Sequence, residues 1–146
     1  MTILPGILQN TILISAMTAW LVAQVIKVLL DLVLQKRLNI ELLLSSGAFP
    51  SSHAAIVCAV ALGVGKYYGW NSPIFAVAAV LAMIVMYDAA GVRRAAGKQA
   101  EVLNQLVERY YVGSDFSQKR LKELIGHTPL EVFGGALVGI IVGLVI

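Results

Sequence analysis

Long apolar runs, separated by short polar segments, dominate the chain. A membrane-spanning helix needs about 20 mostly apolar residues, or somewhat fewer where flanking side chains reach the interface. Four runs meet this requirement, at about 7–34, 54–68, 73–90 and 129–146. The pattern therefore predicts an all-α integral membrane helix bundle of about four transmembrane helices, folded as a single membrane domain over residues 1–146.

Residues 91–128, between the third and fourth runs, follow a different pattern. Apolar residues recur at helical spacing from 103 to 110 and again from 121 to 125, among charged and polar neighbours. This spacing places the apolar residues on one face of a helix. We expect two cytoplasmic amphipathic helices that rest on lipid headgroups or cap the bundle. A plain solvated surface is the other interpretation of the same charges.

The composition supports the assignment to a membrane. Hydrophobic residues make up 59% of the chain and charged residues 13%, whereas about 45–50% and about 25% are usual in globular proteins. The mean hydropathy of +0.84 excludes a water-soluble, disordered or collagen-like protein. The net charge of +3 is too small for a protein that binds nucleic acid. The single cysteine, Cys58, excludes a disulfide framework and a zinc site with several cysteines.

The basic residues are unevenly placed along the chain. Nine of the 11 Lys and Arg residues fall in segments 35–53 and 91–128, whereas the turn at 66–72 contains only Lys66. With four spans, these two segments lie on one side of the membrane, and the positive-inside rule makes that side cytoplasmic. Both termini are then outside. The first ten residues contain no basic residue, so we expect a retained membrane span and no cleavable signal peptide.

Polar residues within so apolar a chain indicate functional positions. On the first span, Lys27 and Asp31 lie one helical turn apart. Either they neutralise each other, or Lys27 is held over a site at the cytoplasmic end of the helix. At the start of the second span, Ser51 or Ser52 can cap the helix, and His53 follows in its first turn. The N–H groups and dipole of such a helix start favour an anion.

The fourth span begins in a similar way. Thr128 and Glu131 form the pattern of a capping box around Pro129, and His127 immediately precedes it. Each of these residues has a structural explanation by itself, but capping does not explain two histidines and several cations at the same depth. The predicted topology brings the following residues to one membrane face: Lys27, His53, Arg93, Arg94 and His127.

This set of groups suits a metal-independent phosphoryl hydrolase. Cations and helix N-termini bind phosphate and stabilise the charge of its transition state. One histidine can attack phosphorus while the other protonates the leaving oxygen, and a carboxylate near the nucleophile fixes its tautomer. We therefore expect both imidazoles to face one pocket, and we expect neither a metal ion nor another cofactor.

Three stretches of the sequence resemble motifs of the type 2 phosphatidic acid phosphatase and vanadium haloperoxidase superfamily. The stretch 50–53, Pro-Ser-Ser-His, is similar to its Pro-Ser-Gly-His motif. Residues 87–97 and 124–132 resemble more specifically its divergent branch of small membrane proteins, which occurs in bacteria and plastids. The likeness covers nearly the whole chain and implies an integral protein of the bacterial plasma membrane.

The resemblance implies a role for each matched residue. His127 would be the nucleophile that forms a phosphohistidine, Glu131 would stand in the place of the superfamily's aspartate, and His53 would be the acid that protonates the leaving group. The residues that would hold the phosphate are Lys27, Arg37, Ser51, Ser52, Arg93 and Arg94.

The sequence departs from the superfamily pattern at several positions. Ser52 replaces a glycine, and no Arg-Pro pair follows Lys27, so that Arg37 is the nearest arginine. The superfamily places five residues between the arginine and the histidine of its third motif, whereas the whole amphipathic segment separates Arg94 from His127.

We therefore expect a membrane-embedded phosphatase that acts on a lipid or prenyl phosphate at the cytoplasmic interface, with membrane lipids as its surroundings and no nucleic acid as a partner. Two other hypotheses remain: a catalytically inactive relative that binds anionic lipid or a partner, and a purely structural helix bundle. Gly135, Gly139 and Gly143 recur at four-residue spacing. They predict a close-packing face, used within the chain or in a homodimer.

Overall fold

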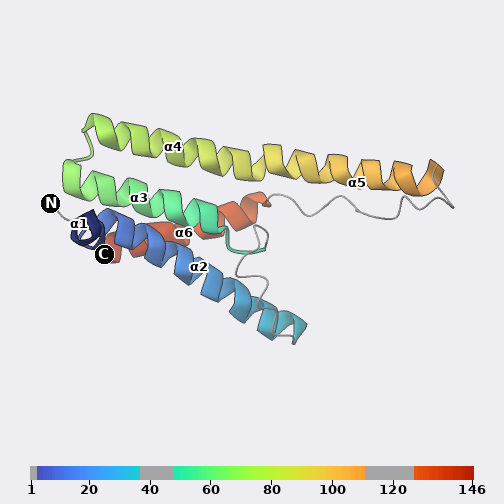
Figure 1. The fold of residues 1–146 in the computed structure, drawn as a ribbon, viewed down its shortest axis with the longest axis horizontal. Coiled ribbons are helices and arrows are strands. Elements are labelled where there is room, and N and C mark those ends of the chain that lie inside the picture. The colour runs from blue at the N-terminus through green and yellow to red at the C-terminus, as the bar shows by residue number, and fades with distance from the viewer. Residues whose placement is uncertain (1–2, 37–47, 111–126) are drawn as a thin grey trace.

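The structure, a computed structural model, describes residues 3–36, 48–110 and 127–146, and all regular secondary structure in these ranges is helical. Figure 1 shows α2, α3, α4 and α6 side by side, with both termini at the same end of this bundle. The central helix is α3, which packs against α2, α4 and α6. The helices are α1 (Ile3–Leu8), α2 (Thr11–Gln35), α3 (Ser52–Tyr68), α4 (Pro73–Ala90), α5 (Val92–Tyr110) and α6 (Pro129–Val145).

Prolines and capping residues set the helix starts. The hydroxyl of Ser72 accepts a hydrogen bond from the N–H of Phe75 (3.2 Å), and Pro73 opens α4. Thr128 and Pro129 open α6 in the same way. Proline lacks a backbone N–H, but an N–H at the first helical position has no acceptor within the helix, so no hydrogen bond is lost there. The predicted third and fourth spans therefore nearly coincide with α4 and α6.

The first apolar run differs from the prediction of one helix over 7–34. The structure has a break at Gln9 and Asn10, and α2 begins only at Thr11. The side chain of Asn10 accepts a hydrogen bond from the N–H of Leu13 (3.0 Å) and so caps α2. The side chain of asparagine can accept a hydrogen bond from a backbone N–H in place of a backbone carbonyl, and so it can start a new helix. Hydropathy does not depend on such bonds, so the hydropathy pattern does not predict the break.

The amphipathic segment forms one helix within the described residues. After Gly91, α5 continues in nearly the direction of α4 and extends beyond the bundle (Figure 1). Among the described helices α5 contacts only α4, so it does not cap the bundle as one expectation had it. The second amphipathic pattern, at 121–125, lies outside the described residues.

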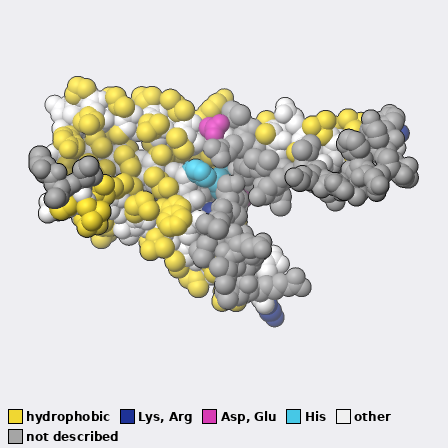
Figure 2. Space-filling view, in the orientation of Figure 1, with side chains coloured by type: hydrophobic (Ala, Val, Ile, Leu, Met, Phe, Trp, Pro, Cys, Tyr) yellow, Lys and Arg dark blue, Asp and Glu magenta, His cyan; other side chains and the backbone are white. Residues whose placement is uncertain are grey.

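Small residues fill the interior of the bundle, and large apolar residues face outward. One buried cluster consists of four alanines from α2 and α3, whereas Val77, Ile84 and Phe133 are each at least 60% exposed. Figure 2 shows hydrophobic side chains spread over the surface of the bundle. Lipid tails are as apolar as leucine, so large side chains gain little by turning inward, and small residues let the backbones approach closely.

Length and composition identify the helices that can cross a membrane. The stretches Thr11–Gln35 and Pro73–Val107 are long and apolar enough, and Pro129–Val145 is apolar but shorter. The central helix, α3, has 17 residues. Together with the outward-facing apolar surface, these helices make the protein an all-α membrane helix bundle, as the sequence predicts.

The three regularly spaced glycines pack against α3 of the same chain. A Cβ atom at Gly135 would collide with the carbonyl oxygen of Ser51, and one at Gly139 would collide with the carbonyl oxygen of Ala55. Gly143 lies against α3 one turn further on, beside Leu62. The close-packing face is thus occupied within the chain, and a homodimer would have to use another surface.

Candidate functional site

The starts of α3 and α6 meet at one end of the bundle, and two backbone hydrogen bonds fix their positions. The N–H of Ser51, which precedes α3, donates to the carbonyl oxygen of Glu131 in the first turn of α6 (2.9 Å). The N–H of His127, which precedes α6, donates to the carbonyl oxygen of Ala89 in the last turn of α4 (2.9 Å). Three helices therefore hold the residues of the two histidine motifs in register.

Both helix starts are capped as their sequences predict. The hydroxyl of Ser51 accepts a hydrogen bond from the N–H of Ala54 (3.4 Å). At α6, the Thr128 hydroxyl accepts from the N–H of Glu131 (3.3 Å), and the N–H of Thr128 donates to Oε2 of Glu131 (3.1 Å). This reciprocal pair is a complete capping box.

Glu131 also holds the imidazole of His127. Its Oε2 lies 2.9 Å from Nδ1 of His127, and because a carboxylate only accepts, Nδ1 carries the proton. The ring of His127 is 1% exposed, so its orientation is fixed by packing as well as by this bond. The proton on Nδ1 makes Nε2 the nitrogen with an available lone pair, which is the tautomer that a nucleophile requires.

The second imidazole lies beside the first. The ring centroids of His53 and His127 are 6.1 Å apart, and the ring planes are inclined at 62°. The two rings are thus direct neighbours at the starts of α3 and α6. His53 is partly exposed, and Figure 2 shows histidine at the molecular surface, next to hydrophobic side chains. The two histidines therefore lie side by side, and that they face one pocket stays a prediction.

Lys27 reaches this site from the middle of α2. Its side chain is 1% exposed, and Nζ donates to the hydroxyl oxygen of Ser52 (3.5 Å). It also interacts electrostatically with Glu131. A buried ammonium group is stable only beside compensating charge and hydrogen-bond acceptors. Of the two interpretations of Lys27 and Asp31, these contacts favour the cation held at the site.

The structure brings together most of the predicted site residues. Arg37 lies outside the described residues. Arg93 and Arg94 belong to the first turn of α5, directly after α4, and their side chains lie outside the described part of the chain. The residues placed at the site are Lys27, Ser51, Ser52, His53, His127 and Glu131.

Sequence reasoning missed the backbone contribution to the site. The carbonyl of Ala89 positions His127 and the carbonyl of Glu131 positions Ser51, yet every residue except proline offers the same backbone groups, so no residue type signals them.

Comparison with known proteins identifies the family. The Divergent PAP2 family matches residues 8–142 of the chain. The chain belongs to this family. It is also 45% identical to the uncharacterized membrane protein YuiD of Bacillus subtilis (strain 168), over 96% of each chain. No solved structure matches it. The resemblance inferred from the three motifs is confirmed.

The Divergent PAP2 geometry accounts for the glutamate at position 131. This residue lies four positions after His127, one helical turn along the chain, and its first bond is to the N–H of Thr128 in the capping box. The extra methylene lets the same carboxylate oxygen reach both Thr128 N and His127 Nδ1. In this chain, one oxygen of Glu131 thus serves two functions, the helix cap and the orientation of the histidine.

Proposed function

We propose that this Divergent PAP2 protein is a metal-independent phosphatase that hydrolyses a lipid or prenyl phosphate. It acts at the cytoplasmic face of a bacterial plasma membrane, with both termini outside. The observation that carries the proposal is the separation of 6.1 Å between the His53 and His127 rings, beside a buried lysine.

In the first step, Nε2 of His127 attacks phosphorus, and the bond between phosphorus and the alcohol oxygen breaks. Protonated His53 donates a proton to that oxygen, so that a neutral alcohol leaves. Lys27 and the N–H groups at the start of α3 face the negative charge that builds on the phosphate oxygens. Glu131 stabilises the imidazolium character of His127 through Nδ1, the nitrogen that it already contacts.

In the second step, water attacks the phosphorus of the phosphohistidine. His53, now neutral, takes a proton from this water. The bond between phosphorus and Nε2 breaks and returns its electron pair to nitrogen, and inorganic phosphate leaves. His53 thus gives up one proton in the first half-reaction and takes one from water in the second, and both histidines regain their starting states after each turnover.

The surface beside the site supports an apolar alcohol as the leaving group. Leu130 and Phe133 on the first turns of α6, and Tyr87 near the end of α4, are each more than half exposed. A hydrocarbon chain lying in the bilayer would contact this surface while its phosphate meets the histidines. Phosphatidic acid and phosphatidylglycerol phosphate would release an alcohol of this form, whereas polyprenyl pyrophosphate would release a polyprenyl phosphate, whose oxygen takes the proton in the same way.

The test is phosphate release by the purified protein in detergent micelles, with EDTA present, from a panel of these three substrates. We expect release from at least one of them, together with an acid-labile, alkali-stable phosphoprotein after rapid quenching. A folded protein that releases nothing from the whole panel contradicts the proposal. If vanadate binds competitively in that case, the second hypothesis, an inactive relative that binds anions, takes its place.

Changing Glu131 to glutamine separates its two functions. Glutamine retains an oxygen that accepts from Thr128 N, so the cap survives, but the negative charge beside the His127 imidazole is lost. We expect the turnover rate to fall by about a thousandfold with little change in the thermal unfolding midpoint. Glu131→Asp, which keeps the charge on a shorter side chain, serves as the comparison and should retain more activity. Equal rates for Glu131→Gln and the unchanged protein would exclude an electrostatic role.

A further inference from the structure

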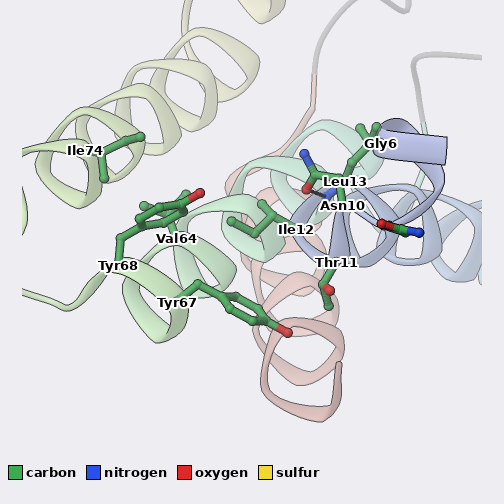
Figure 3. A pocket seen from close by; sticks show the side chains of 10 residues that line it. Gly6, Asn10, Thr11, Ile12, Leu13, Val64, Tyr67, Tyr68 and Ile74 are labelled. Carbon is green, nitrogen blue, oxygen red and sulfur yellow. Dashed lines mark hydrogen bonds between the residues drawn. The ribbon is translucent and has the colours of Figure 1, made fainter. Parts of the chain in front are cut away.

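A cavity of about 760 Å³ lies at the end of the bundle away from the histidines. The start of α2, the end of α3 and the first turn of α4 line it, and it is open to the surface (Figure 3). Ligand cavities in proteins commonly have volumes of about 300–1,000 Å³, so this cavity has the size of a binding site for a small molecule or a lipid headgroup.

Hydroxyl and amide groups line one part of the cavity. Tyr67 and Tyr68 come from the last turn of α3, and Figure 3 shows Tyr67 reaching toward Thr11 at the start of α2. Gln9 and Asn10 add two side-chain amides. Because Oδ1 of Asn10 already accepts from the N–H of Leu13, the group of Asn10 that can meet a ligand is its NH2, a donor.

None of the described residues that line the cavity carries a charge. The nearest basic residue along the chain, Lys66, donates from Nζ to the carbonyl oxygens of Gly143 (3.2 Å) and Leu144 (3.1 Å) at the end of α6. Its charge is therefore engaged by a helix C-terminus, where a cation is favoured. An anionic headgroup would find no matching cation among the described lining residues, whereas a neutral headgroup with hydroxyl groups would find both donors and acceptors.

The remaining lining is aliphatic and opens among lipid-facing side chains. Ile12, Val64 and Ile74 form this part, and Trp70, at the same end of the bundle, is 55% exposed. Tyrosine and tryptophan concentrate where a membrane protein meets the headgroup layer. The cavity thus combines a polar side at headgroup level with an apolar side at acyl-chain level.

We propose that this cavity binds an uncharged lipid whose headgroup bears hydroxyl groups, in the leaflet opposite the histidine site. Tyr67, Tyr68 and Thr11 hydrogen-bond the hydroxyl groups, and the aliphatic lining contacts the start of the acyl chain. The required chemistry is shared by diacylglycerol, which has one hydroxyl, and by glycolipids, which have a sugar.

The test uses the full chain in nanodiscs of phosphatidylcholine and a diacylglycerol with a photoreactive acyl chain. We expect labelling in peptides covering 3–13 and 64–74, at least about tenfold above that by phosphatidylserine with the same acyl chain, since a charged headgroup would lose its hydration beside an uncharged lining. Neither probe is a phosphate monoester, so the result does not depend on phosphatase activity. Competition by unlabelled diacylglycerol against unlabelled monoglucosyldiacylglycerol identifies which headgroup binds better.

A double variant, Thr11→Val with Tyr67→Phe, removes two hydroxyl groups without changing the shape of the lining. We expect it to lower the labelling by diacylglycerol about tenfold. Tyr87→Phe, which removes a tyrosine hydroxyl at the other end of the bundle, is the matched control and should leave labelling unchanged. Equal labelling by phosphatidylserine, or undiminished labelling of the double variant with its fold intact, overturns the proposal.

Discussion

Replacing His127 with alanine is expected to abolish both phosphate release and phosphoprotein formation, a loss of about 10⁵-fold or more. No other described side chain at the site combines a nucleophilic nitrogen with the orientation that Glu131 imposes on His127. The readouts are the rate of phosphate release and the phosphoprotein recovered after rapid quenching, each measured on protein with an unchanged thermal unfolding midpoint.

His53→Ala should lose activity in a different way, because the proposed mechanism has His53 protonate the leaving group. Against a lipid phosphate, whose alkoxide is a poor leaving group, we expect a decrease of about 10²–10⁴-fold. Against an aryl phosphate such as p-nitrophenyl phosphate, whose leaving group needs no proton, the decrease should nearly vanish. If instead His127→Ala is the variant that the aryl phosphate rescues, the two roles are exchanged. If neither variant loses activity, the site lies elsewhere.

The second large effect is expected from a substitution at the contact between α3 and α6, and it is an effect on stability. We expect Gly139→Ala to destabilise the protein by about 2–3 kcal/mol. The added Cβ would collide with the carbonyl oxygen of Ala55 and lie 2.9 Å from the Cβ of Cys58, and a backbone carbonyl cannot move without its helix. Because α3 bears His53 and α6 follows His127, separation of these helices should also weaken vanadate binding.

The chain provides a matched control for this substitution. A Cβ at Gly6 meets no atom within 4 Å, so Gly6→Ala is the same chemical change in open space. It should leave the thermal unfolding midpoint in detergent unchanged or raise it slightly, since alanine favours a helix more than glycine does. A midpoint for Gly139→Ala equal to that for Gly6→Ala would show that α3 and α6 are not held as closely as the structure has them.

The sequence predicts those parts of the fold that local rules determine. Ser72 and Pro73 mark the start of α4, and Thr128 and Pro129 mark the start of α6, because capping depends on neighbouring residues alone. The location of His53 and His127 at the same end of the bundle was also predictable. An odd number of membrane crossings between these two residues would have placed them at opposite ends, and the apolar runs give an even number.

The parts that were not predictable depend on contacts between distant segments or on competing local bonds. The break at Asn10 lies within an apolar run for which hydropathy alone predicts one continuous helix. Spacing shows that Gly135 and Gly139 form a face, but it does not show which helix covers that face. The hydrogen bonds from the N–H groups of His127 and Ser51 to backbone carbonyls cannot be predicted from the types of the residues, because nearly every residue has the same backbone groups.

The lengths of α3 and α6 have a consequence for the depth of the histidines. Each helix has 17 residues, which extend about 26 Å at 1.5 Å per residue, against a hydrocarbon thickness of about 30 Å. With the aromatic residues at the end of α3 anchored in one headgroup layer, the other ends of both helices stop short of the opposite layer. If the protein acts on a lipid phosphate as proposed, that phosphate must lie deeper in the bilayer than the neighbouring headgroups to reach the imidazoles. Its depth then depends on the thickness of the bilayer, through the mismatch with these two short helices.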